Sequence, residues 1–227
     1  RNSSTDVHNA LDRFHDQEVE GVILDLRSNG GGALDDAWKI AGLFLPSGPI
    51  VKVKGARQEH VFRDTDNKVS YDGPLIVLVN QFSASASEIV AAALQDYNRA
   101  VIVGSSHSYG KGTVQTFINL DKNFFGSNVS SLDTEPLGSL KLTIQKFFRV
   151  NGGATQFKGV IPDIILPTKE DYFKTGEKEL DNALSWTTIP SLTYKKWEDD
   201  VSYLTALQIH SKKRIDSSDY FNQVITF

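Results

Sequence analysis

Three serines alternate with alanines just before a strong helical pattern, and this stretch could carry chemistry. Ser83, Ser85 and Ser87 lie between an apolar run at residues 74–80 and an alanine-rich segment that extends to Asp96. The apolar run is rich in β-branched residues and is bounded by Gly-Pro, which predicts a buried strand. A helix that begins after it would offer unpaired N–H groups and the positive end of a dipole. A serine presented there could act as a nucleophile, because backbone N–H groups would stabilise the oxyanion it creates.

A structural role for the same serines is the alternative. Ser83, Ser85 or Ser87 could simply cap the helix, and Ser85 with Glu88 fits a capping box. Caps are far commoner than nucleophiles, so this stretch alone favours a cap. The choice therefore depends on whether the chain also supplies a base and an oxyanion site.

A lysine in a glycine-lined turn is the candidate base. Lys111 lies between Gly110 and Gly112, after a predicted strand at residues 100–104, and Gln115 follows four residues later. A neutral lysine can activate a serine, and burial favours the neutral form by lowering the pKa of the amine. Gln115 could accept a hydrogen bond from that amine and fix its direction. The alternative for Lys111 is an ordinary exposed cation in a turn.

A run of three glycines is the candidate oxyanion site. Residues 30–32 are all glycine and follow a predicted strand at 21–27. Glycine permits a positive φ and the close approach of backbone to a ligand. The run lacks the spacing of a P-loop or of a dinucleotide-binding fingerprint. A plain tight turn and a backbone oxyanion donor both remain open.

Strands that alternate with helices predict an α/β core with some parallel pairing. Expected helices cover residues 5–17, capped by Ser4, and 33–45, ended by Pro46. Further strands are expected at 50–53 and 59–63 as a hairpin, from 113 onward, at 140–150, and at 159–165 as a closing edge strand; residues 121–137 are expected to form a polar loop. Beyond a boundary near Pro167, we predict helices at 177–184 and 197–214. The expected division is a core at 1–168 and a small, mostly helical appendage at 169–227.

Composition excludes several kinds of function. The chain has 227 residues, a net charge of −4 and no basic tract, so nucleic acid is not an expected partner. It has no cysteine, which excludes disulfides, thiolate zinc sites and a cysteine nucleophile. The histidines lack ligand spacing, so neither a metal nor another cofactor is expected. No apolar run reaches the length of a membrane span, and a start at Arg-Asn without any methionine indicates a processed chain or a fragment.

His107 offers a competing catalytic arrangement. It lies in the loop beside Lys111, and Asp25 or Asp96 could orient its ring in a Ser–His–Asp hydrolase. The chain has no Gly-x-Ser-x-Gly elbow, however. An exposed loop residue is the favoured interpretation of His107.

Three motifs together resemble the tail-specific, or C-terminal processing, serine proteases. They are residues 25–32, 83–89 and 110–115, in this order, with further similarity at 95–97, 141–153 and 158–163. Residues 176–184 are similar to the start of the extra C-terminal region in the long bacterial type. The resemblance covers nearly the whole chain and implies a fold related to the crotonase and Clp protease group.

The resemblance also implies roles for individual residues. It places the nucleophile at Ser85, the general base at Lys111 and a supporting glutamine at Gln115. The oxyanion hole would use the backbone N–H groups of Ala86 and Gly31. Ser83 and Ser87 would then be capping or packing residues.

The implied activity is that of a serine endopeptidase acting on proteins or peptides with an exposed C-terminus. An adaptor protein is a further partner that the resemblance allows, and the implied location is the bacterial periplasm or cell envelope. Such enzymes usually carry a PDZ domain and, in the long type, an N-terminal helical region, and this chain contains neither. Any membrane association would need segments outside this chain. A non-catalytic peptide-binding module of the same fold is the alternative from another class.

Overall fold

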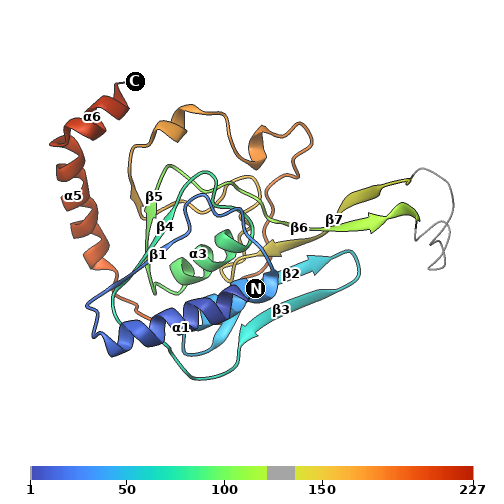
Figure 1. Cartoon of the computed structure of the whole chain (residues 1–227), viewed down its shortest axis with the longest axis horizontal. Coiled ribbons are helices and arrows are strands. Elements are labelled where there is room, and N and C mark those ends of the chain that lie inside the picture. The colour runs from blue at the N-terminus through green and yellow to red at the C-terminus, as the bar shows by residue number, and fades with distance from the viewer. Residues whose placement is uncertain (1, 122–135, 227) are drawn as a thin grey trace.

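The fold consists mainly of two four-stranded sheets with a helix between them (Figure 1). The structure is a computed structural model that describes residues 2–121 and 136–226. One sheet has the strand order β1-β4-β5-β8 and the other has the order β3-β2-β7-β6. The predicted α/β class is confirmed, with parallel pairing in the first sheet and antiparallel pairing in the second.

The parallel sheet consists of short, apolar strands. They are β1 (Val22–Asp25), β4 (Leu75–Val79), β5 (Val101–Gly104) and β8 (Ile164–Ile165). Parallel neighbours need a crossover connection, and helices supply it between the first three strands. The glycine loop follows β1, the serine turn follows β4, and the lysine loop follows β5. The three loops that could carry chemistry therefore all leave the carboxyl ends of adjacent parallel strands, where ligands bind in such sheets.

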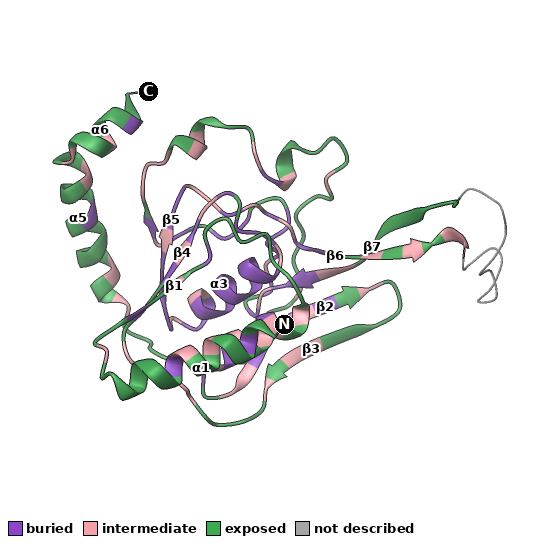
Figure 2. Cartoon of the chain, in the orientation of Figure 1, coloured by how far each residue is buried: buried purple, intermediate pink, exposed green. Residues whose placement is uncertain are grey.

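The antiparallel sheet contains the predicted hairpin and a long arm. Its strands are β2 (Gly48–Gly55), β3 (Glu59–Asp64), β6 (Thr113–Asn119) and β7 (Ser139–Phe148). The β6–β7 pair extends away from the rest of the molecule (Figure 1). Its distal part is exposed (Figure 2), and its buried residues are Thr113 at the start of β6 and Phe147 and Phe148 at the end of β7.

Helix α3 (Ala86–Asp96) lies at the centre of the core. All of its residues except Gln95 are buried, which Figure 2 shows as an almost continuous purple helix. It contacts α2 (Leu34–Gly42), β2 and β5, and α1 (Ser3–Asp16) packs outside α2. The alanines of α3 allow these elements to approach closely, so the position of the serine turn is fixed by the densest part of the molecule.

Several predicted element ends were wrong. The N-cap of α1 is Asn2 rather than Ser4, and its side chain accepts a hydrogen bond from Thr5 N. Helix α2 ends at Gly42 rather than at residue 45, because residues 43–45 form a tighter turn before Pro46. The edge strand β8 has two residues, whereas residues 159–165 were predicted. The loop predicted at 121–137 lies mostly outside the described residues.

The C-terminal region also departs from the prediction. The helix expected at 177–184 is a single 3₁₀ turn, η2 (Glu177–Glu179). At the two ends of the expected helix, Glu177 N donates to Tyr109 O and Leu184 O accepts from Gln156 Nε2, so these groups bond to core loops instead. Another 3₁₀ turn, η1 (Lys169–Tyr172), precedes it. The helix expected at 197–214 begins at Ser202, where the Asp200 side chain accepts from Ser202 N. It is α5 (Ser202–Asp216), and α6 (Asp219–Ile225), which the sequence did not predict, follows it.

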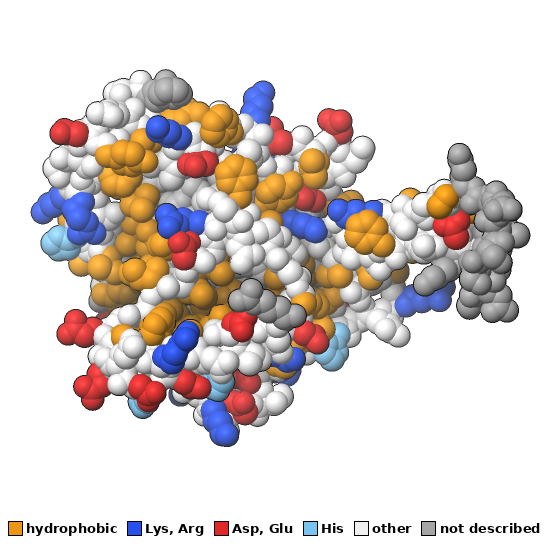
Figure 3. Space-filling model, viewed as in Figure 1, with side chains coloured by type: hydrophobic (Ala, Val, Ile, Leu, Met, Phe, Trp, Pro, Cys, Tyr) orange, Lys and Arg blue, Asp and Glu red, His pale blue; other side chains and the backbone are white. Residues whose placement is uncertain are grey.

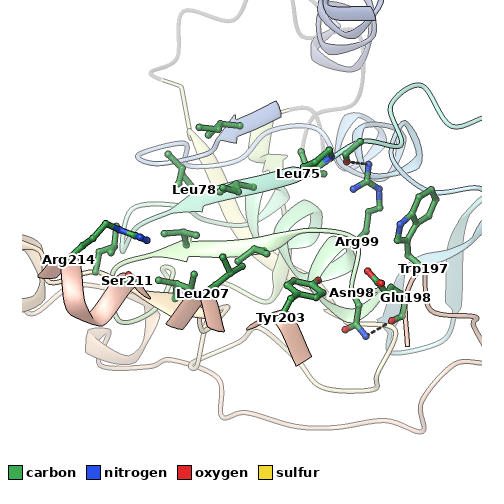
Figure 4. A pocket seen from close by; sticks show the side chains of 18 of the residues that line it. Leu75, Leu78, Asn98, Arg99, Trp197, Glu198, Tyr203, Leu207, Ser211 and Arg214 are labelled. Atoms are coloured by element: carbon green, nitrogen blue, oxygen red, sulfur yellow. Dashed lines mark hydrogen bonds between the residues drawn. The ribbon is translucent and has the colours of Figure 1, made fainter. Parts of the chain in front are cut away.

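Helices α5 and α6 cover the outer face of the parallel sheet and leave an apolar cleft of about 850 Å³. Figure 3 shows hydrophobic side chains gathered in the hollow beside these helices. Figure 4 shows the cleft from close by, with Leu75 and Leu78 on the sheet, Leu207 on α5, and Trp197 beside Arg99. In the described part of the chain, no helix is both long and apolar enough to cross a membrane.

Candidate active site

Ser85 occupies an unusual backbone conformation at the N-terminus of α3. Its φ is +57° and its ψ is −112°, a region that residues with a side chain rarely adopt. Such conformations persist only where the surroundings enforce them, and they cluster at functional sites. The neighbouring serines bond to backbone carbonyls of the glycine loop and the strand before it: Ser83 Oγ donates to Leu26 O at 2.8 Å and Ser87 Oγ donates to Asn29 O at 3.0 Å. Of the three serines, only Ser85 is half-buried; the other two are buried.

The glycine loop packs directly against the serine turn. Gly31 has a φ of +95°, and a Cβ atom there would lie 2.6 Å from Ala84 O and 2.8 Å from Ala86 N. Only glycine fits this contact without a shift of backbone. Gly31 N–H donates to Asn29 Oδ1 at 2.9 Å, so this donor already has a partner. Ala86 N–H, the first of α3, has no partner within the residues that the structure describes.

Ser85 and Lys111 line one cavity of about 300 Å³. Its other lining residues are Gly32, Leu34, Ala86, Ile89, Thr113, Val114, Gln115, Phe117, Lys141 and Phe147. Lys111 is half-buried and Gln115, on β6, is exposed. Neither a Lys111–Ser85 nor a Lys111–Gln115 side-chain hydrogen bond is present in this structure, although all three residues are described. The predicted nucleophile, base and supporting glutamine thus share a cavity, while the bonds between them are not formed.

Glu88 connects the serine turn to the lysine loop, and sequence reasoning missed this role. Its fully buried carboxylate accepts from Ser85 N at 2.8 Å, Ser108 Oγ at 2.5 Å, Gly110 N at 2.7 Å and Lys111 N at 2.9 Å. Burial raises the pKa of Glu88 to about 7, although the four hydrogen bonds act in the opposite direction. The capping-box pattern revealed the contact with Ser85, but no local signal could indicate donors from a loop beyond the next strand.

His107 lies outside the cavity, and both of its ring nitrogens have partners. Nδ1 donates to Ser108 O at 2.6 Å, and Nε2 lies 3.1 Å from Lys178 Nζ. The carboxylates that could have oriented it are paired elsewhere, Asp25 with Arg27 at 2.7 Å and Asp96 with Arg149 at 2.6 Å. These residues therefore do not form a Ser–His–Asp triad. Within the described ranges, no three His, Cys, Asp or Glu side chains are placed to hold a metal ion.

Two models of known families match this chain. The model of "Peptidase family S41" matches residues 1–166. The chain belongs to peptidase family S41. A second model, described as the C-terminal domain of tail specific protease (DUF3340), matches residues 171–225 of this S41 chain.

Curated relatives carry protease names. A "Tail-specific protease" of Haemophilus influenzae is 46% identical over 212 residues, which are 92% of this chain and 29% of that protein. A "Carboxy-terminal-processing protease" of Bartonella bacilliformis is 41% identical over 172 residues, covering 72% of this chain and 36% of that protein. The S41 chain thus spans about a third of the length of these relatives.

Solved structures give the same family and fold. The photosystem II D1 C-terminal processing protease superposes with a TM-score of 0.61 and 29% identity, over 73% of this chain and 39% of that one. Mature CPAF superposes with a TM-score of 0.58 over 72% of this chain and 42% of that one. Its identity is 14%, so this second likeness concerns the fold alone.

Proposed function

We propose that this S41 chain is the catalytic part of a serine endopeptidase in which Ser85 is the nucleophile and Lys111 the general base. The observation that carries the proposal is the strained Ser85 at the N-terminus of α3, facing a cavity that Lys111 also lines. The family membership supports serine peptidase chemistry. Both ring nitrogens of His107 have partners and this residue does not line the cavity, which favours lysine over histidine as the base.

The proposed reaction uses residues from all three loops. Neutral Lys111 takes the proton of Ser85 Oγ as this oxygen bonds to a peptide carbonyl carbon. The Ala86 N–H and a donor from the glycine loop stabilise the oxyanion, and losing one such donor usually costs about 3–4 kcal/mol in the transition state. Lys111 then gives the proton to the leaving amine, and water releases the acyl group by the reverse route. Gln115 would orient the lysine amine once substrate closes the cavity.

The glycine-loop donor has two candidates. Gly31 is the one that family resemblance suggests, but its N–H donates to Asn29 Oδ1 in this structure. Using it would require the Asn29 side chain to move. The adjacent Gly32 lines the cavity with Ser85 and is the alternative.

The proposed substrates are proteins recognised through their C-terminal tails, in keeping with the names of the relatives. We further propose an envelope or periplasmic location, an adaptor protein as a partner, and a division into a peptidase core at 1–168 and a C-terminal region at 169–227. Cleavage of a peptide with a free apolar C-terminus, compared with its C-terminally amidated form, tests the tail preference. Equal cleavage of the two peptides would contradict it.

A fluorophosphonate probe tests the chemistry directly, because it reacts only with an activated serine. We expect labelling of Ser85 in the unchanged chain and none in Ser85→Ala. Lys111→Ala should lower the labelling rate by roughly 10²- to 10⁴-fold, the usual contribution of a general base. His107→Ala is the matched control and should label almost normally. A loss in His107→Ala as complete as in Ser85→Ala would overturn the lysine assignment, and a folded chain that never labels would favour a non-catalytic peptide-binding module.

A further inference from the structure

Two buried glutamines connect the catalytic loops to a segment of the C-terminal region. Gln156 and Gln81 are 0% and 2% exposed, respectively, and neither lines the cavity of Ser85. Each uses both ends of its side-chain amide. A buried amide whose nitrogen and oxygen are both hydrogen-bonded fixes the orientation of the groups it joins. Leaving any of these polar atoms without a partner would cost free energy. The segment they bond to lies within residues 169–186, which we call the strap.

Gln156 bonds the strap to the backbone beside the proposed base. Its Oε1 accepts from Gly112 N at 2.8 Å, and its Nε2 donates to Glu177 Oε1 at 3.1 Å and Leu184 O at 3.0 Å. The contact with Gly112 is close enough that a Cβ atom there would lie 2.5 Å from Gln156 N. A movement of the strap would therefore also move Gly112, the residue next to Lys111.

Two neighbours of Gln156 hold the same turn. Thr155 Oγ1 donates to Lys111 O at 3.1 Å, and Phe157 N donates to Gly110 O at 2.7 Å. On the other side, Lys111 N donates to Glu88. The backbone N–H and C=O of Lys111 are thus both hydrogen-bonded. These bonds restrict rotation of the backbone at Lys111 and so fix the direction in which its side chain leaves the turn.

Gln81 bonds the strap to the serine turn. Its Nε2 donates to Asp171 Oδ1 at 3.0 Å, and its Oε1 accepts from Thr175 Oγ1 at 2.5 Å. The same Asp171 oxygen accepts from Ser106 N, in the lysine loop, at 3.2 Å. One carboxylate of the strap therefore holds both catalytic loops at once.

The middle of the strap lies against the lysine loop. Glu177 N donates to Tyr109 O at 2.9 Å, and Lys178 Nζ reaches the His107 ring. Gly176 has a φ of +109°, and a Cβ atom there would lie 2.9 Å from Tyr109 O. The lysine loop is thus enclosed between α3 on one side and the strap on the other.

We propose that the strap is a positioning element of the peptidase site, and that Gln156 and Gln81 are the positioning residues through which it sets Lys111 relative to Ser85. This rests on the proposed function. It gives the C-terminal region a role in the reaction without contact to substrate. A displacement of about 1 Å between reacting groups can lower a rate by about 100-fold, so small movements of the strap would suffice.

The test measures the rate of fluorophosphonate reaction at Ser85 in the full chain, with circular dichroism to confirm folding. We expect Gln156→Leu and Gln81→Leu to react roughly 10- to 100-fold more slowly while remaining folded. In peptide cleavage, kcat should fall by the same factor and KM should change little, because neither residue lines the cavity. Ser191→Ala is the matched control; it removes a hydrogen bond to Val150 O, away from both catalytic loops, and should react normally.

An exchange of partners separates positioning from general destabilisation. Q156E places two carboxylates together and removes the donor to Leu184 O, so it should slow labelling. Q156E combined with E177Q restores a donor and an acceptor between positions 156 and 177 but leaves Leu184 O without its donor, so it should recover part of the rate. If Gln156→Leu fails to fold, the comparison of Q156E with the double variant Q156E and E177Q still tests the proposal. Normal labelling of the folded glutamine variants, or no recovery in the exchanged pair, would overturn the proposal. If the unchanged chain itself fails to label at Ser85, the proposed function fails first and the role of the strap fails with it.

Discussion

Gly31 is the residue at which a single added methyl group would meet the serine turn. Its φ of +95° disfavours any side chain, and the added Cβ would lie 2.6 Å from Ala84 O. We expect Gly31→Ala to lower the free energy of unfolding by about 1–3 kcal/mol and to abolish labelling of Ser85, because the turn must shift. Urea unfolding and probe labelling measure the two effects. Gly30→Ala is the matched control, since a Cβ there meets nothing within 4 Å; equal damage in the two variants would contradict this explanation.

The carboxylate of Glu88 should make stability depend on pH. Burial raises its folded pKa from 4.5 to about 7, so the folded protein holds this proton more tightly than the unfolded chain does. Its contribution to stability is fully present below about pH 4.5 and is lost as the pH rises to about 7. We expect the free energy of unfolding of the unchanged chain, relative to that of Glu88→Gln, to fall across this range and then to level off. Urea titrations at several pH values measure it, and a difference that stays constant with pH would contradict the raised pKa.

Helix α3 is joined to the residue that follows β7 by a largely buried ion pair. Asp96, the last residue of α3, lies 2.6 Å from Arg149 Nη2, and their side chains are 5% and 15% exposed. Removing the carboxylate would leave the guanidinium buried without its charge partner. We therefore expect Asp96→Ala to lower the free energy of unfolding by about 3–5 kcal/mol.

A second ion pair serves as the control for this prediction. Lys212 and Asp216 on α5 pair at 3.2 Å with side chains that are 76% and 59% exposed. Solvent screens such pairs, so Asp216→Ala should change the free energy of unfolding by about 0.5 kcal/mol or less. Similar losses in the two variants, measured by urea unfolding, would mean that burial does not decide the strength of the pair.

At the scale of the whole molecule, Trp197 holds the start of the C-terminal helices against the core, at one end of the apolar cleft (Figure 4). The centroid of its ring lies 4.8 Å from the guanidinium carbon of Arg99, and its backbone N–H donates to Tyr97 O at 2.8 Å. Arg99 is buried and donates to the carbonyls of Phe44, Tyr71 and Gly73. The tryptophan therefore covers a cation that has no carboxylate partner among the residues that the structure describes.

Loss of this ring should loosen the C-terminal helices before the core. We expect Trp197→Ala to increase amide hydrogen exchange in α5 and α6 while protection in α3 persists, since the ring contributes apolar contact and about 0.5–2 kcal/mol of cation–π attraction. Tyr220→Ala, which removes an exposed ring from α6, is the control. Uniformly faster exchange throughout the chain would show that these helices do not open separately.

Local patterns in the sequence determined the strands, the central helix and the three loops at their ends. Alternation of apolar residues, glycine runs and a Gly-Lys-Gly turn are readable within about ten residues, and their order also predicted the family. Element ends were less certain, because a cap such as Asn2 has several neighbouring polar residues that could serve equally well. The sequence predicted some parallel pairing, and the structure then showed that the glycine, serine and lysine loops leave the same edge of the sheet.

Only the tertiary structure decided how those loops are held. The bonds of Glu88 to Ser108, Gln156 to Gly112 and Gln81 to Asp171 span 20, 44 and 90 residues. The sequence does not indicate which groups a buried amide or carboxylate bonds to. Its partners depend on how distant segments pack together and not on their spacing along the chain. The strained φ of Ser85 likewise follows from the glycine loop and α3 pressing on one turn, which no local pattern could express.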